Sequence, residues 1–70
     1  MKNFLAVIKI QGLSGTAYYQ KIISAGTLRA AKSRAYASIG DQTGDVVLIG
    51  EQAAAGIQDA ANLIIKGGEL

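Results

Sequence analysis

Three positive charges lie within six residues near the middle of the chain, in the stretch SAGTLRAAKSRAYASIG at residues 24–40. Cationic side chains next to aromatic rings are a chemistry that suits single-stranded nucleic acid, because the cations meet phosphates and the rings stack on bases. Further cations and two tyrosines occur earlier in the chain. The sequence therefore permits a nucleic-acid-binding module that uses a basic hairpin and a helix over 28–38, with the candidate residues Lys9, Tyr18, Lys21, Arg29, Lys32 and Arg34.

The same stretch also fits an ordinary crossover helix with one solvated face. Apolar residues recur at helical spacing at Leu28, Ala31, Ala35 and Ile39, while the cations of the first two turns lie opposite them. Thr27 is suited to cap the helix at its start, and Gly40 is suited to cap its end. The basic residues are explained by this helix alone, so nucleic-acid binding remains the alternative function.

Residue types that carry enzymatic or metal chemistry are scarce. The chain has no Cys and no His, which excludes the usual Cys/His zinc sites and the nucleophile–base arrangements that need either residue. Lys32 and Ser33 are adjacent and cannot face each other on a helix. Asp41 and Asp45 share a Gly-containing loop and are typical turn formers. We therefore predict a non-enzymatic protein with no catalytic residues, no cofactor and no metal.

The charges are divided unevenly along the chain. Residues 1–40 contain six cations and no acid, whereas residues 41–70 contain one cation and five acids, for net charges of +6 and −4. Such a division favours either a basic surface for an anionic partner or a dipolar molecule that packs head to tail.

The elements that must position these residues follow from the apolar pattern and the glycines. Two β-rich segments, residues 3–11 and 16–25, flank GLSG and predict an antiparallel hairpin in which Gln11 faces Thr16 and Lys9 faces Tyr18. The run DVVLIGE at 45–51 is nearly unbroken in its apolar residues and predicts a central, buried strand. A last helix is expected within residues 52–68, either through Gly56 or starting late because of it.

The resulting order is β-β-α-β-α in a single small domain over residues 1–70. We expect an α+β sandwich in which two helices lie on a three-stranded sheet and the third strand runs parallel to the second. A sheet this small is expected to leave an open edge and a half-covered face, and both favour a second copy of the chain.

The size of the chain favours association. A domain of 70 residues buries only about 60% of its unfolded surface, so its stability is marginal without a partner. We predict a protein that acts through protein–protein contacts, as a homodimer, a larger homo-oligomer or bound to another protein. The predicted interface is the mixed sheet face with the last helix, represented by Leu5, Val7, Ile22, Ile57 and Ile64.

The opening segment MKNFLAVIKI is predicted to be a first strand rather than a secretion signal, because its apolar run is short and Lys9 interrupts it. No segment approaches the roughly 20 apolar residues that a membrane span needs. We expect a cytoplasmic protein with no membrane partner, a setting with which the absence of cysteine is consistent.

Overall fold

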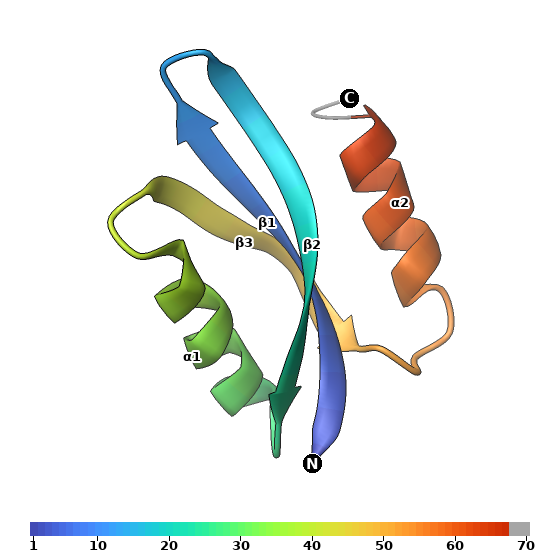
Figure 1. Cartoon of the computed structure of the whole chain (residues 1–70). Helices are drawn as coiled ribbons and strands as arrows, with labels where there is room; N and C mark the ends of the chain where they lie inside the picture. Colours follow the sequence, from blue (N-terminus) through green and yellow to red (C-terminus); the bar gives the residue numbers. More distant parts are fainter. Residues whose placement is uncertain (68–70) are drawn as a thin grey trace.

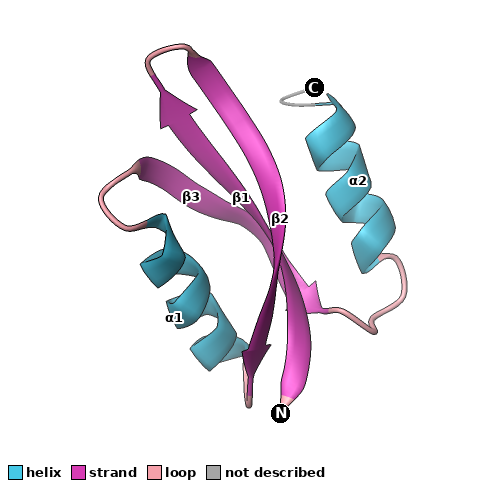
Figure 2. Ribbon diagram, in the orientation of Figure 1, coloured by secondary structure: helices cyan, strands magenta, loops and turns pink. Residues whose placement is uncertain are grey.

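The structure, a computed structural model, describes residues 1–67 and has the predicted order of elements. Figure 1 shows three strands between two helices, and Figure 2 shows the same arrangement by type of secondary structure. The chain is an α+β fold whose elements, in order, are β1 (Lys2–Gly12), β2 (Gly15–Ala25), α1 (Leu28–Ile39), β3 (Thr43–Glu51) and α2 (Ile57–Gly67).

The three strands form one antiparallel sheet in the order β2-β1-β3. The pairings expected in the hairpin are confirmed: Gln11 faces Thr16, Lys9 faces Tyr18 and Ile8 faces Tyr19. Only two residues separate the Gly12–Gly15 pair, and Gly15 adopts a positive φ of 126° as it leaves the turn. Because β3 also pairs antiparallel with β1, it runs in the same direction as β2, with β1 between them.

The prediction that residues 45–51 form a central strand is wrong, because the first strand occupies the centre and β3 lies at an edge. Helices cover both faces of the sheet, so an edge strand here carries apolar residues on both sides and reads in sequence like a central one. A register shift opposite Val7 and Ile8 leaves Val47 as an extra residue, a β-bulge, and its side chain is 40% exposed.

The two helices lie on opposite faces of the sheet (Figure 2), so each face is covered in part by one helix. Helix α1 covers the face that carries Phe4, Ala6 and Ile23, and α2 covers the face that carries Leu5 and Val7. The division of side chains between faces follows the period of two along β1 that the sequence predicts.

The helix ends follow local backbone chemistry. The Thr27 hydroxyl accepts a hydrogen bond from the Ala30 N–H at 3.1 Å, and Gly40 ends α1 with a φ of 64°, which confirms both predicted caps. The last helix starts late: residues 52–56 form turns, Gly56 has a φ of 83°, and α2 begins at Ile57. Ala54 therefore lies in the turns before α2.

Candidate interaction surface

The direction of the backbone groups at the two sheet edges follows from one hydrogen bond. The Asn3 carbonyl on β1 accepts the Gln52 N–H at 2.9 Å, so it points towards the β3 side. Backbone groups alternate in direction along a strand, so the odd-numbered residues of β1 point towards β3 and the even-numbered ones towards β2. Residues of β2 that pair with odd-numbered residues of β1 therefore present their N–H and C=O groups to the open edge of β2. Residues of β3 that pair with even-numbered residues of β1 do the same at the open edge of β3.

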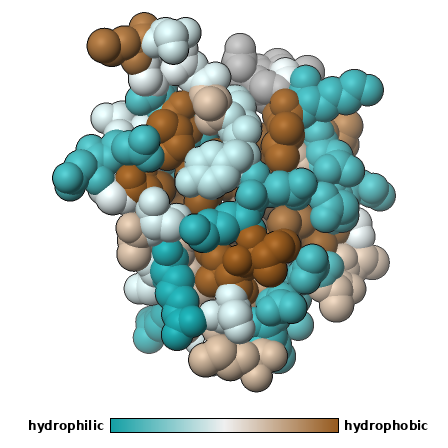
Figure 3. All heavy atoms as spheres, viewed as in Figure 1, coloured by the Kyte–Doolittle hydropathy of each residue, from teal (hydrophilic) through white to brown (hydrophobic). Residues whose placement is uncertain are grey.

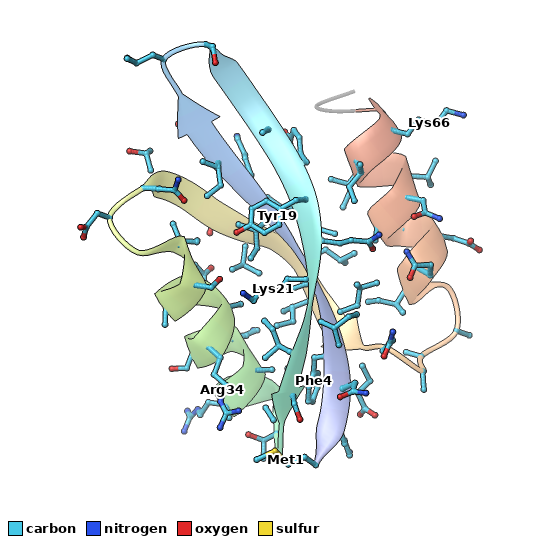
Figure 4. All side chains as sticks on the ribbon, viewed as in Figure 1. Met1, Phe4, Tyr19, Lys21, Arg34 and Lys66 are labelled. Atoms are coloured by element: carbon cyan, nitrogen blue, oxygen red, sulfur yellow. The ribbon has the colours of Figure 1, made fainter. Side chains whose placement is uncertain are left out.

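On β2, Ser24 pairs with Asn3, so the Ser24 carbonyl faces the open edge. The Arg34 guanidinium on α1 donates a hydrogen bond to this carbonyl. Figure 4 shows Arg34 and Lys21 on the same side of β2, between the strand and α1. The β2 edge thus has a charged cap at one end and a second cation, Lys21, along it, both typical of edges protected against further strand pairing.

On β3, Val46 pairs with Ile8, so the Val46 N–H faces the other open edge. The Asp45 carboxylate accepts this N–H at 2.8 Å and also accepts the Tyr36 hydroxyl of α1 at 3.0 Å. This hydrogen bond and the carboxylate charge both raise the pKa of Tyr36 above its ordinary value. Asp45 therefore links α1 to the β3 edge and satisfies one of the backbone N–H groups at that edge.

Between α1 and the β3 edge runs a groove of about 390 Å³ that we call the β3 groove. Its apolar side chains remain open to solvent: Leu28 is 43%, Tyr36 51% and Val47 40% exposed. The groove is lined by Leu28, Lys32, Tyr36 and residues 46–49. A second hollow of about 430 Å³ shares Leu28 and continues towards Gly50 and Glu51. Together they form an apolar surface along an unpaired strand.

Charges are unevenly paired around the β3 groove. Lys2 and Glu51 form an ion pair at 3.4 Å, with both side chains more than half exposed. It is the one ion pair within residues 1–67, so Lys32, which lines the groove, has no acidic partner within that part of the chain. The β3 groove therefore combines apolar surface with Lys32, which has no acidic partner within residues 1–67, and the adjoining hollow carries the Lys2–Glu51 pair.

The predicted protein interface is distributed differently from expectation. Leu5 and Val7 are buried beneath α2, and Ile57 and Ile64 are half-buried against them. Of the five, Ile22 alone is exposed, at 48%. The chain's own last helix thus covers the sheet face on which this hypothesis was based, because its apolar side faces Leu5 and Val7 directly.

The predicted nucleic-acid-binding residues do not share one surface. Lys9 and Tyr18 are cross-strand neighbours, as expected, but they lie on the α2 face, and on its other side Lys9 faces Asp45 of β3. Lys21 and Arg34 lie at the β2 edge. Arg29 and Lys32 line the outer side of α1 together. The six candidates are therefore spread over three regions of the molecule.

Sequence reasoning missed the residues that shape the β3 groove, above all Tyr36 and Val47, and the Asp45 carboxylate that accepts the Tyr36 hydroxyl. A signal was present on the helix, where Leu28, Lys32 and Tyr36 are spaced by four and lie along one side. No sequence signal marks the bulge at Val47, because one extra residue in an apolar run does not change the composition of that run.

Other classes of site gain no support from the structure. Within residues 1–67, no three Asp or Glu side chains gather where a metal ion would sit. None of the helices in that range has the length and apolar character that crossing a membrane requires. Comparison of the chain with protein-family models, curated proteins and solved structures finds no match.

Proposed function

We propose that this chain is a non-enzymatic binding and assembly module that works through protein–protein contacts as a homo-oligomer. The observation that supports it is the exposure of large apolar side chains. Within residues 1–67 six are buried and nine are exposed. The buried ones are Phe4, Leu5, Val7, Ile8, Ile23 and Ile39, and the exposed ones are Met1, Leu13, Tyr19, Ile22, Leu28, Tyr36, Val47, Leu63 and Ile65.

Single exposed apolar side chains are normal on protein surfaces, so their grouping matters more than their number. Leu28, Tyr36 and Val47 line one groove. The β2 side differs: Figure 3, in which β2 faces the viewer as in Figure 1, shows apolar patches separated by polar side chains. Burying the groove in a complex would add roughly 25 cal/mol for each Å² of apolar surface, a gain that a domain with so small a core needs.

The proposal is tested by measuring the mass in solution by light scattering at low and high salt. We expect a dimer or larger assembly that survives high salt, because apolar burial is not screened. We also expect the melting temperature to rise with protein concentration, since unfolding and dissociation are then linked. A monomer under both salt conditions, with a melting temperature independent of concentration, would contradict the proposal.

A second candidate function is nucleic-acid binding, which the outer side of α1 favours. Arg29 and Lys32 lie together there and form no ion pair within the described residues. If they contact phosphates, Arg29→Ala and Lys32→Ala should each lower the salt dependence of binding by about one released counterion. Titration with single-stranded oligonucleotides at several salt concentrations measures this slope, and unchanged slopes in both variants would remove α1 from this function.

A cytoplasmic location is part of the proposal. It rests on composition, since the absence of cysteine, and so of disulfides, is consistent with a reducing compartment. Localisation of the tagged full chain in cell fractions would test it directly.

A further inference from the structure

We propose that two copies of this chain pair through residues 47–51 of β3, antiparallel around a two-fold axis, so that two three-stranded sheets become one sheet of six strands. This inference rests on the proposed homo-oligomer and names the surface that forms it. Edge-to-edge pairing satisfies backbone groups that otherwise face water, and symmetric pairing closes the assembly at two copies.

The backbone of β3 limits where such pairing can occur. Ile49 and Glu51 pair with Ala6 and Phe4, the even-numbered residues of β1, so their N–H and C=O groups face the open edge. Towards the start of β3 the next outward amide, that of Val46, is already taken by Asp45. The free stretch is therefore residues 47–51. The proposed pair is centred on its middle residue, Ile49, the register that brings Val47 opposite Glu51 of the partner subunit.

Centring on Ile49 determines which side chains meet. Ile49 lies beside Ile49 of the partner subunit, and Val47 lies opposite Glu51 of the partner subunit. Leu28 lines the groove alongside Ile49 and lies near the axis, where it adds its exposed surface to the contact. The apolar centre of the contact thus comes from side chains that are partly exposed in the single chain.

Lys32 of the β3 groove and Glu51 at the end of β3 have opposite charges that meet in this arrangement. Lys32 lines the groove together with Val47, so Glu51 of the partner subunit comes to lie near Lys32. Glu51 also pairs with Lys2 of its own chain at 3.4 Å, and its half-exposed carboxylate has a second oxygen for Lys32. The two-fold axis repeats this pair on the other side. Within the part of the chain that the structure describes, the β2 edge offers no such match, because it presents Lys21 and Arg34 without an acidic residue. Pairing of β2 with β2 of a second copy would bring like charges together. Charge therefore favours β3 over β2 as the surface between copies.

Charge reversal tests the pairing without changing the core. Lys32→Glu and Glu51→Lys each place like charges opposite one another in both symmetric pairs, and we expect each to weaken self-association by about tenfold or more. Mixing the two variants restores opposite charges at both pairs, so a mixed dimer should form where neither variant dimerises alone. Arg29→Glu makes the same change of charge one turn earlier on α1, outside the residues that line the β3 groove, and should leave association unchanged.

Light scattering and sedimentation give the masses, circular dichroism confirms that each variant folds, and hydrogen exchange reports the backbone. The Ile49 amide should exchange slowly at high protein concentration and quickly at low concentration. A monomeric wild-type chain would overturn both the proposed function and this inference. A stable dimer that Lys32→Glu leaves intact, with an unprotected Ile49 amide, would overturn this inference alone. A mass that keeps growing with concentration would also overturn it, in favour of head-to-tail pairing of β3 with β2.

Discussion

The two helices cover opposite faces of the same sheet with nearly equal lengths, yet they are held in different ways. Helix α1 buries Ala31, Ala35 and Ile39 completely or almost so, and its side chains reach both sheet edges, at Ser24 and at Asp45. Helix α2 fully buries Ala61 alone. Its one side-chain hydrogen bond to the sheet, among the described residues, joins Gln58 to Gln20 at 3.0 Å.

This difference shows how a small sheet can hold one helix tightly and another loosely. Small alanines allow α1 to approach the strands closely, and bonds at both edges prevent it from shifting sideways. Helix α2 presents the larger side chains of Ile57 and Ile64 to the sheet, and both stay half-buried. We therefore expect changes on the α1 face to be costly and matched changes on the α2 face to be absorbed by movement of the helix.

The largest contrast is expected from enlarging one buried alanine on each helix. Ala35→Leu should lower the free energy of unfolding by about 3 kcal/mol, because α1 cannot move away from the sheet. Ala61→Leu should lower it by only about 1 kcal/mol, because α2 can shift outwards. Urea unfolding at one fixed protein concentration measures both. Equal costs would show that α2 is held as firmly as α1.

Two glycines of β3 offer a second matched pair. A Cβ at Gly44, on the α1 face, would overlap the Lys9 carbonyl oxygen and approach the end of Ile10 to 2.8 Å. A Cβ at Gly50, on the α2 face, would meet the tip of Ile57 at 2.7 Å, and that side chain can rotate away. We expect Gly44→Ala to cost about 2 kcal/mol and Gly50→Ala less than about 1 kcal/mol in chemical denaturation. The reverse order would contradict the comparison.

The starts of the two helices differ by a smaller amount. Thr27→Ala removes the side-chain cap of α1 and should cost about 1 kcal/mol. Asp59→Asn removes a charge from the first turn of α2, which interacts with the helix dipole, and should cost about 0.3 kcal/mol. Thermal unfolding of both variants at matched concentration provides the measurement, with Thr27→Ser as a control that keeps the cap.

The bond between α1 and the β3 edge should respond to alkaline pH. The pKa of Tyr36 is raised in the folded chain, so the neutral hydroxyl stabilises the fold below about pH 10, where unfolded tyrosine is also neutral. This contribution is lost as the pH rises through the raised pKa. We expect the difference in urea midpoint between wild type and Tyr36→Phe to shrink between pH 9 and 11. A difference that stays constant would show that Tyr36 does not stabilise the fold through its proton.

Much of the fold was accessible from sequence because local patterns determine it. The hairpin register followed from GLSG, and both ends of α1 followed from Thr27 and Gly40. The position of β3 could not be predicted, since an apolar run covered by helices on both faces reads the same at the centre and at the edge. The expected interface includes both buried and exposed residues for a related reason: an apolar stripe on the last helix predicts that it packs on a sheet, but not whether that sheet belongs to its own chain or to a neighbour.

The sequence by itself determined which residues form strands and helices and which side of each is apolar, because these depend on the periods of two and 3.6 and on the residues at the turns. The tertiary structure alone decided that β1 lies at the centre, which leaves β2 and β3 open. It also decided that Arg34 and Asp45 close part of each edge and that Lys32 lies beside Val47 without an acidic partner within the described residues. These features join residues far apart in the chain, and their meeting depends on how the strands are ordered.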